Sequence, residues 1–192
     1  MAHCSRRGTG GGIVCDVRDE AQVAAFAERV RRDLGTPTIV VNNAGLGKFA
    51  PVAEMSVETW DAVIETNLRG MFLVTRAFLP AMLSAARGTI VNIASTAARN
   101  GREGGGAYSA SKHGVLGFSK SLLLEVRQKN VRVLAVCPGS VDTDFWSAPG
   151  ITAIPAERML QPEDVAQIIL DAIALPERAM VSELDIRPTN PG

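Results

Sequence analysis

The chain lacks the features that mark a secreted, a membrane-spanning or a metal-binding protein. Its cysteines, Cys4, Cys15 and Cys137, are odd in number and show neither a C-x-x-C pair nor the spacing of metal ligands. We therefore predict reduced thiols and no metal site. No apolar run is long enough to span a bilayer, and residues 1–7 lack the apolar stretch of a signal peptide. These absences predict a cytoplasmic protein.

The chain also has no net charge. Twenty basic and twenty acidic residues cancel to a formal charge of zero, so no overall field attracts nucleic acid or an anionic membrane. Hydrophobic residues make up 46% and charged residues 21% of the sequence, as in ordinary globular domains. A chain of 192 residues can bury a sizeable core. We predict one domain over residues 13–192, preceded by a loop or disordered segment over residues 1–12.

Strand-like and helix-like patterns alternate along the chain. Short apolar runs predict strands over residues 13–17, 38–41, 88–93, 131–136 and 181–186. Helical spacing and end signals predict helices over residues 20–34, 57–83, 108–128 and from 162 onward. The first of these helices begins at Asp19, with Gln22 as a capping-box partner, and stops at Gly35. Strands that are apolar on both faces and alternate with helices indicate an α/β fold, a parallel sheet covered on both faces.

Tyr108 and Lys112 are the most informative pair in the sequence. They lie four residues apart in the run Tyr-Ser-Ala-Ser-Lys and therefore share one face of the predicted helix. A free tyrosine has a pKa of about 10, and a neighbouring cation favours phenolate. We expect Lys112 to lower the pKa of Tyr108, so that the phenol can donate and accept a proton near neutrality. Solvated pairs of this kind are common on surface helices, so the accompanying motifs matter.

Three motifs of small and polar residues follow the predicted central strands. These are Asn42-Asn43-Ala44-Gly45 after residues 38–41, Ser95 after residues 88–93, and Pro138-Gly139-Ser140-Val141-Asp142-Thr143 after residues 131–136. Ligands of parallel sheets bind beyond the carboxyl ends of the strands, where these motifs lie. Each motif alone also fits an ordinary turn or helix cap. A fourth signal is Asn67, a modest helix former inside the predicted helix over residues 57–83, where it could also simply face solvent.

Taken together and in this order, the motifs resemble the short-chain dehydrogenase/reductase family over nearly the whole chain. The resemblance implies a Rossmann-like sheet and hydride transfer between NAD or NADP and an alcohol or ketone. It implies that Tyr108 exchanges a proton with the substrate oxygen, that Lys112 binds the nicotinamide ribose, and that Ser95 holds the substrate oxygen. Asn67 is implied to hold a water of the proton relay. The implied cofactor contacts on the adenine side are Asp16, whose carboxylate accepts from the adenine amine, the adjacent Val17, and the turn of Asn42, Asn43, Ala44 and Gly45. On the nicotinamide side, besides Tyr108 and Lys112, they are Pro138, Gly139, Val141 and Thr143.

The family's phosphate-binding turn, T-G-x-x-x-G-x-G, is missing from the sequence. Residues 8–12 are glycine-rich, but a predicted strand rather than a helix follows them, so we interpret them as a flexible loop. The resemblance then implies a fold that is incomplete in its N-terminal half and begins near the family's third strand, through truncation or a misplaced gene start. Val40 and Val41 would lie on an exposed edge, unless residues 13–17 pair there. The alternative function is a non-catalytic fragment or a cofactor-free interaction protein.

The resemblance is least informative about the substrate. Residues 144–160 correspond to the family's variable substrate loop, in which Trp146 could cover an apolar substrate or anchor the loop on the core. Residues 181–188 resemble the ending of 3-hydroxy acid dehydrogenases and related carbonyl reductases. The helices over residues 57–83 and 108–128 are the family's usual pairing faces, which implies a homodimer or tetramer. The choice between NAD and NADP stays open.

Overall fold

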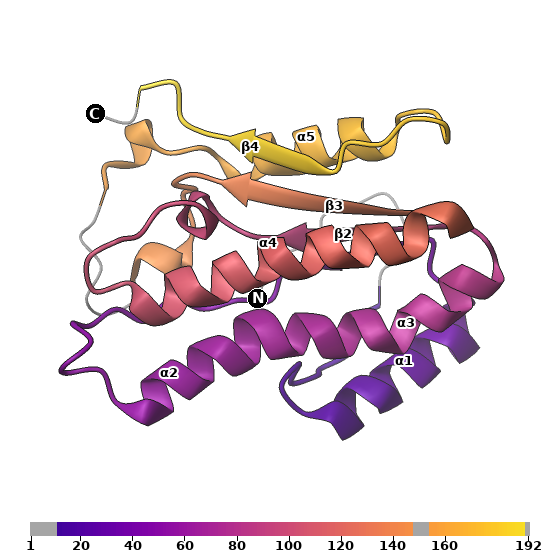
Figure 1. Cartoon of the computed structure of the whole chain (residues 1–192), viewed down its shortest axis with the longest axis horizontal. Coiled ribbons are helices and arrows are strands. Elements are labelled where there is room, and N and C mark those ends of the chain that lie inside the picture. Colours follow the sequence, from indigo (N-terminus) through magenta and orange to yellow (C-terminus); the bar gives the residue numbers. More distant parts are fainter. Residues whose placement is uncertain (1–10, 148–153, 191–192) are drawn as a thin grey trace.

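Four parallel strands form a single sheet in the computed structural model, which describes residues 11–147 and 154–190 (Figure 1). The strands are β1 (Ile39–Asn42), β2 (Gly88–Ile93), β3 (Val131–Pro138) and β4 (Glu183–Ile186), in the spatial order β1-β2-β3-β4. Each pair is in parallel register, for example Asn42 opposite Asn92. The predicted α/β class with a parallel, Rossmann-like sheet is confirmed. The predicted loop at the N-terminus falls mostly on residues 1–10, outside the described part.

The helices lie where the apolar periodicity predicts them. They are α1 (Glu20–Leu34), α2 (Val57–Ile64), α3 (Met71–Ser84), α4 (Gly106–Val126) and α5 (Pro162–Ile173). A π-helical segment, η1 (Glu65–Gly70), joins α2 to α3, and short 3-10 turns are η2 (Thr96–Ala98), η3 (Arg127–Lys129), η4 (Asp144–Ser147) and η5 (Ala156–Arg158). The predicted helix over residues 57–83 is therefore continuous but widened in its middle. Pi-helical turns of this kind occur often at functional sites.

The start of α1 departs from the predicted capping box in one contact. The Asp19 carboxylate accepts hydrogen bonds from the backbone amides of Ala21 and Gln22, as an N-cap should. The Gln22 side chain accepts from the backbone amide of Asp16 at 3.0 Å rather than from that of Asp19. Gly35 ends the helix with a positive φ of 83°. The helix boundaries are as predicted, and Gln22 additionally fixes the segment that precedes the helix.

The predicted strand over residues 13–17 is wrong. These residues form no strand, and Val14 is fully exposed. Val17 packs instead against Gly70, where an added Cβ would come within 2.7 Å of the valine methyl group. The backbone carbonyl of Arg18 accepts a hydrogen bond from Arg69. Because residues 16–18 dock on the α2–α3 helix, they do not pair with β1, which is the edge strand of the described sheet.

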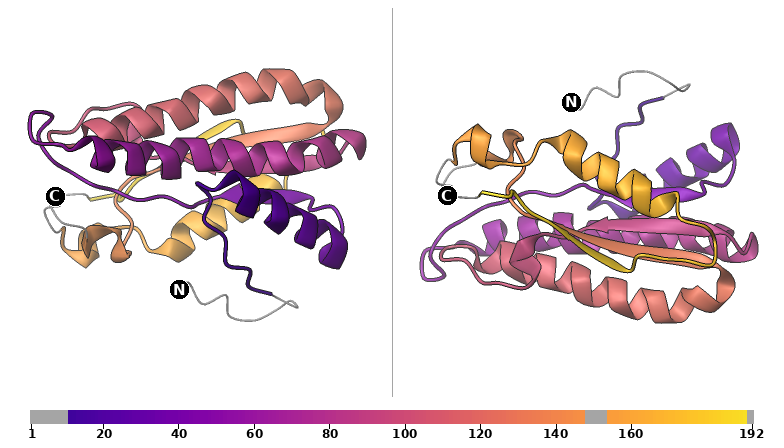
Figure 2. Two further views of the ribbon diagram at one scale, coloured as in Figure 1. Left: turned by 90° about the horizontal axis from the view of Figure 1, so that it is seen from below. Right: turned by 90° about the horizontal axis from the view of Figure 1, so that it is seen from above.

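Side-chain alternation on the strands divides the core into two layers. Val133, Ala135 and Cys137 of β3 face clusters that contain residues of α3 and α4, whereas Leu134 and Val136 face a cluster that contains Ala172 of α5. The helices α3 and α4 thus cover one face of the sheet and α5 covers the other (Figure 2). On β1, Val40 is buried, but Ile39 and Val41 are 45% and 48% exposed. The predicted apolar exposure at the β1 edge therefore falls on these two side chains.

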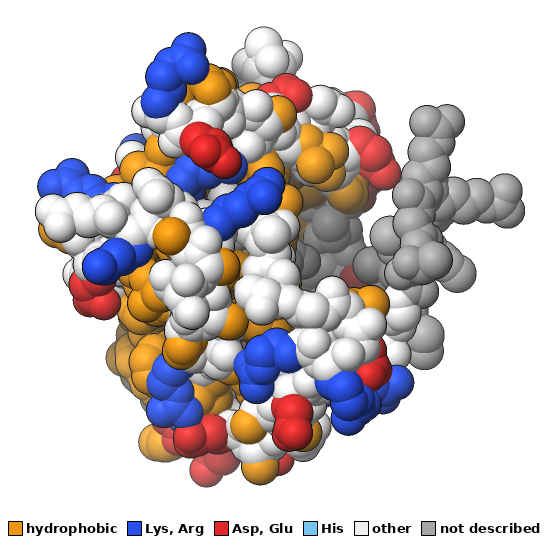
Figure 3. All heavy atoms as spheres, turned by 90° about the vertical axis from the view of Figure 1, so that its right-hand side faces the viewer, with side chains coloured by type: hydrophobic (Ala, Val, Ile, Leu, Met, Phe, Trp, Pro, Cys, Tyr) orange, Lys and Arg blue, Asp and Glu red, His pale blue; other side chains and the backbone are white. Residues whose placement is uncertain are grey.

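Charged and apolar groups share the outer surface. At the end of the molecule where the strands begin, basic and acidic side chains are interspersed with patches of apolar ones (Figure 3). Within the described residues, every helix is too short or too polar to cross a lipid bilayer. The exposed apolar side chains include Phe72 and Leu124, on the helices α3 and α4.

A row of buried polar side chains ties the sheet to the helices above it. The amide nitrogen of Asn42 donates to Thr75 at 3.0 Å and to Asn92 at 2.8 Å, and Asn92 donates to Ser119 at 2.9 Å. Thr75, Asn92 and Ser119 are each at most 3% exposed. Buried amides are costly unless their hydrogen bonds are made, so this row fixes the ends of β1 and β2 relative to α3 and α4.

Replacing Asn92 with alanine should destabilise the protein by about 2–3 kcal/mol. The substitution removes two buried hydrogen bonds, leaves part of the Asn42 amide without a partner and opens a small void. The free energy of unfolding in urea measures the loss. Asn100→Ala is the matched control, because Asn100 is exposed and makes only a local bond to Thr96. Equal stability of the two variants would show that the buried row contributes nothing.

Candidate active site

The carboxyl ends of β1, β2 and β3 lie beside the first turns of α4, where the predicted catalytic residues meet. Tyr108 and Lys112 share one face of α4, with the Lys112 ammonium 5.8 Å from the centre of the phenol ring. Lys112 is only 6% exposed, and its Nζ donates to the backbone carbonyl of Ile93 at 2.7 Å. Ile93 is the last residue of β2, so this hydrogen bond fixes the lysine at the carboxyl end of that strand. The predicted common face is confirmed.

Burial changes the ionisation of Lys112. Loss of solvation disfavours the ammonium and lowers the pKa of Lys112 from 10.5 to about 8. The folded protein therefore binds fewer protons than the unfolded chain between about pH 8 and pH 10.5. Its stability should rise with pH across that window through this group. A lysine poised near neutrality is typical of functional sites.

The structure corrects the expected ionisation of Tyr108. Burial raises the pKa of the phenol above its ordinary value of 10. The opposing influences are a hydrogen bond with the Ser95 side chain and the positive charge of Arg102; Lys112 is not among them. At neutral pH the phenol is therefore protonated. A protonated phenol is suited to donate a proton, which is the role required when a carbonyl is reduced.

Ser95 lies on the other side of the phenol, at the start of η2. Its hydroxyl oxygen caps that turn by accepting from the backbone amide of Ala97 at 3.1 Å. The hydroxyl also lies close enough to the phenol to lower the pKa of Tyr108. The cap fixes the position of the oxygen, so that two hydroxyl groups converge where the carboxyl end of β2 meets α4. Ser95 and Tyr108 are thirteen residues apart in sequence and adjacent in space.

Asn67 lies in the π-helical segment and is 2% exposed. Its side-chain oxygen accepts from the amide of Leu46 at 2.8 Å, and its nitrogen donates to the carbonyl of Leu46 at 3.0 Å. The same nitrogen donates to Ser111 at 3.0 Å, and Ser111 in turn donates to the carbonyl of Tyr108 at 2.7 Å. Asn67 therefore links the turn after β1 to α4. Ser111 was not predicted as a site residue. It lies between Tyr108 and Lys112 in sequence, on the inner side of the helix, and is fully buried.

The Asn42-to-Gly45 turn contributes by close approach of its backbone. A Cβ added at Gly45 would lie 3.3 Å from the Asn67 oxygen and 3.6 Å from the Lys112 nitrogen. Glycine at this position thus leaves room between the two polar groups. Asn43 and Ala44 are exposed at the same turn. Asn42 points the other way, into the buried polar row, so its side chain is not available for the adenine contact that the resemblance implies.

Asp16 and Val17 are occupied by other contacts. The Asp16 carboxylate pairs with Arg18 at 2.6 Å, and this partner lowers the pKa of Asp16 to about 2. Val17 packs on Gly70. The carboxylate remains exposed, but an adenine amine would have to compete with the guanidinium for it. The implied adenine role of Asp16 stays a prediction.

The Pro-Gly turn after β3 lies against the C-terminal segment. The amide of Gly139 donates to the carbonyl of Ile186 at 2.8 Å, and an added Cβ would meet Pro188 at 3.1 Å. Val141 forms an isolated parallel bridge with Leu160. The Thr143 hydroxyl accepts from the amide of Phe145 at 3.4 Å. These contacts hold the turn from Pro138 to Thr143 at the carboxyl end of the sheet.

Trp146 anchors the loop that follows. Its indole nitrogen donates to the backbone carbonyl of Val141 at 2.7 Å, so the anchoring interpretation of this residue has direct support. Part of the predicted substrate loop, residues 148–153, lies outside the described residues.

Aromatic side chains from neighbouring loops pack around Tyr108, and the sequence did not predict that they would cluster. The phenol ring lies 5.6 Å from the ring of Phe49 and 5.4 Å from that of Phe145, measured between centres. Phe145 covers Gly47, where a Cβ would come within 2.5 Å of the ring. Arg102 lies 4.8 Å above the ring of Phe49. These contacts join three loops, and no sequence periodicity connects them.

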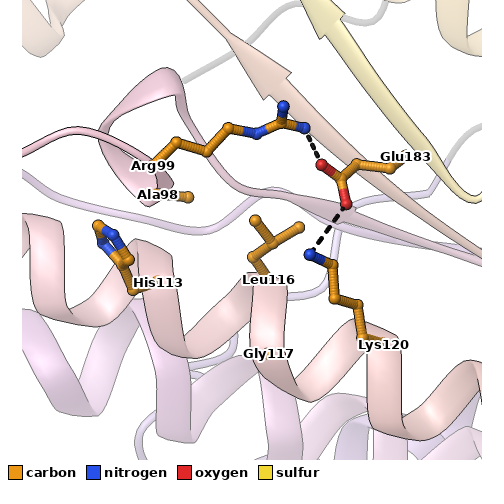
Figure 4. A pocket seen from close by; sticks show the side chains of 7 residues that line it. All are labelled: Ala98, Arg99, His113, Leu116, Gly117, Lys120 and Glu183. Atoms are coloured by element: carbon orange, nitrogen blue, oxygen red, sulfur yellow. Dashed lines mark ion pairs between the residues drawn. The ribbon is translucent and has the colours of Figure 1, made fainter.

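A separate hollow of about 470 Å³ lies on the outer side of α4, between η2 and β4 (Figure 4). Leu116 and Lys120 of α4 line it, together with Arg99 and Glu183. Glu183 pairs with Arg99 and, at 3.4 Å, with Lys120. Its charges are therefore satisfied within the protein. Tyr108 does not line this hollow, so the hollow is separate from the site at which Tyr108, Ser95 and Lys112 meet.

In the part of the chain that the structure describes, no three histidine, cysteine, aspartate or glutamate side chains lie close enough together to bind a metal ion.

The family model described as short chain dehydrogenase matches residues 5–150. The chain belongs to this family. Its members are oxidoreductases.

Relatives of this chain include reductases and dehydrogenases of several substrates. It is 38% identical over 164 residues to the 3-oxoacyl-[acyl-carrier-protein] reductase FabG of Thermotoga maritima, covering 82% of this chain and 67% of the relative. It is 38% identical over 188 residues to the D-threitol dehydrogenase of Mycolicibacterium smegmatis, covering 94% and 72%. An alcohol dehydrogenase of Thermococcus sibiricus, solved with 5-hydroxy-NADP, superposes with a TM-score of 0.83 at 29% identity, covering 91% and 73%.

The residues of this short-chain dehydrogenase fit one end of a nicotinamide cofactor better than the other. At the nicotinamide end, a Cβ at Gly45 would contact both the Asn67 oxygen and the Lys112 nitrogen, so glycine keeps this region free of a side chain. The diphosphate end has a poorer counterpart. Helix N-termini bind phosphates through free amides, but the N-terminus of α1 is capped by Asp19 and followed by Glu20. These two carboxylates would repel a diphosphate.

Proposed function

We propose that this chain is an NAD(P)-dependent oxidoreductase that interconverts a secondary alcohol and a ketone. The observation that carries the proposal is the convergence of Ser95, Tyr108 and Lys112 at the carboxyl end of β2. Burial keeps the Tyr108 phenol protonated at neutral pH, and the Ser95 hydroxyl lies close enough to influence the pKa of that phenol. The Lys112 ammonium lies 5.8 Å from the phenol ring.

The chain's own residues divide the proton chemistry between them. In reduction, Tyr108 donates its proton to the carbonyl oxygen of the substrate, and Ser95 donates a hydrogen bond to the same oxygen. A donor fixed where negative charge develops is worth roughly 3 kcal/mol of barrier by analogy with measured oxyanion holes. In the reverse direction the Tyr108 oxygen accepts the hydroxyl proton. Asn67 positions α4 through Ser111, and a water of the proton relay at Asn67 stays a prediction.

A nicotinamide cofactor, when bound, supplies or accepts the hydride. Lys112 and the Pro138-to-Thr143 turn would hold its nicotinamide end, and the Asn43-to-Gly45 turn would support its adenine side. The choice between NAD and NADP stays open. The homodimer or tetramer through α2, α3 and α4 remains a prediction. A non-catalytic fragment or a cofactor-free interaction protein is the rival, and its support is the phosphate-binding turn that the sequence lacks.

Cofactor binding separates the two functions. We expect NADPH to quench the fluorescence of Trp146 saturably, with a dissociation constant on the order of tens to hundreds of micromolar, because Lys112 is in place while the phosphate-binding turn is missing. A Trp60→Phe background leaves Trp146 as the single tryptophan. Lys112→Met should weaken binding, whereas Lys120→Met, on the outer side of α4, should not. If quenching does not saturate at millimolar NADPH, the cofactor-free alternative is correct.

A further inference from the structure

Arg102 is a cation on the rim of the Tyr108 site that has no acidic partner. It is exposed, and its guanidinium lies 4.8 Å above the ring of Phe49. Over residues 11–147 and 154–190, no carboxylate forms an ion pair with it. Arg99, three residues earlier in the same loop, is paired with Glu183 and Asp185. Two arginines of one loop thus differ in whether their charge is satisfied.

The loop that carries Arg102 is held in place by its backbone. The carbonyl of Gly104 accepts from the amide of Ala50 at 2.9 Å, which ties the loop to the segment that contains Phe49. Gly104 has a positive φ of 67°. A Cβ added to Gly104 would lie 3.6–3.7 Å from the backbone of Ala50. Stacking on an aromatic ring further limits the guanidinium, which keeps its hydrogen-bond donors free at the edge.

Arg102 is also close enough to the phenol to act on it. Both groups contact the ring of Phe49, which lies 5.6 Å from the Tyr108 ring, between centres, and 4.8 Å from the Arg102 guanidinium. The charge of Arg102 lowers the pKa of Tyr108 against the effect of burial. A substrate whose oxygen meets Tyr108 and Ser95 therefore has the apolar ring of Phe49 beside it and a cation that stacks on the same ring.

We propose that Arg102 binds an anionic group, a carboxylate or a phosphate, on the substrate of this site. The group lies a few bonds from the ketone or alcohol carbon, and the short apolar link between them packs on Phe49. A guanidinium pairs with either anion through two parallel hydrogen bonds. The inference rests on the proposed function for the position of the reacting carbon, but anion binding itself does not depend on turnover.

The test measures equilibrium binding without cofactor, so that it succeeds or fails independently of hydride transfer. Trp146 fluorescence in the Trp60→Phe background follows the binding of three probes: 3-oxobutanoate, its uncharged methyl ester, and 3-oxobutyl phosphate. We expect at least one anionic probe to bind about tenfold more tightly than the ester. Arg102→Gln should remove that advantage and leave ester binding unchanged within twofold, and Arg102→Lys should restore part of it. The carboxylate and phosphate arms show which anion the site prefers.

The control is Arg87→Ala, an exposed arginine just before β2 at the opposite end of the sheet, which should bind all probes as the parent does. Raising the salt concentration should weaken anion binding but not ester binding in the parent protein, a readout that needs no variant to fold. Equal affinity for ester and anions in the parent protein would overturn the proposal. So would an equal loss of both in Arg102→Gln.

Discussion

Replacing Tyr108 with phenylalanine is expected to reduce kcat by about a thousandfold or more while changing the affinity for NADPH by less than about threefold. The phenol is the proposed proton donor, and general acid catalysis contributes roughly 10²–10⁴-fold to a rate. The ring itself stays, so its contacts with Phe49 and Phe145 should persist. Turnover is followed by the loss of NADPH absorbance with a ketone substrate, and affinity by fluorescence quenching.

Phe49→Leu is the matched control for Tyr108→Phe. It alters the ring group around Tyr108 without removing an ionisable proton, so we expect kcat to fall by less than tenfold. A Tyr108→Phe variant that turns over like the parent, with Phe49→Leu more damaging, would assign catalysis to packing rather than to the phenol. Because Tyr108 is the only tyrosine of the chain, a spectroscopic titration of the parent also reports its ionisation directly, and it should show a pKa above 10.

Replacing Lys112 with methionine should lower kcat/KM by about a hundredfold and change its pH dependence. The parent's pKa of about 8 for Lys112 predicts that kcat/KM for reduction declines above about pH 8, as the buried amine loses its proton. In Lys112→Met no cation remains at any pH, so the low activity should show no decline at that pH. A pH profile of kcat/KM reports groups of the free enzyme and therefore measures this step.

Lys112→Arg separates the charge from its titration. Arginine stays protonated throughout the range, so any residual activity of that variant should be independent of pH between about 7 and 9. Were the decline near pH 8 to persist in Lys112→Arg, another group would be responsible for it. The stability profile gives a second view: the rise in unfolding free energy between about pH 8 and pH 10.5 should vanish in Lys112→Met.

The sequence predicts the central elements well because local signals determine them. The apolar runs that became β1, β2 and β3 are bounded by turn residues, and Pro162 and Gly35 mark helix ends. Residues 13–17 carry the same kind of apolar run and form no strand. A strand needs a neighbour to pair with, and Val17 finds its contact on Gly70 instead. Pairing is a long-range property that a local run does not encode.

The candidate site divides in a similar way. The four-residue spacing correctly placed Tyr108 and Lys112 on one face of α4, because helix geometry determines which residues share a face. Alternation along β1 also held usable information: Asn42 shares a face with the buried Val40 and therefore points toward α3. The ionisation of Tyr108 could not be inferred, since it depends on burial and on Arg102. That arginine reaches the site through contacts between loops that follow no periodic pattern.

Hydride transfer itself is the most direct test of the central claim that Ser95, Tyr108 and Lys112 form a reductase site. The purified chain is incubated with saturating NADPH deuterated at the transferable position and a ketone, and the product is analysed by mass spectrometry and NMR. We expect the parent protein to form alcohol that carries deuterium on the carbinol carbon, and Tyr108→Phe to form almost none. Absence of deuterated alcohol from the parent protein, under conditions where NADPH binding is saturated, would contradict it.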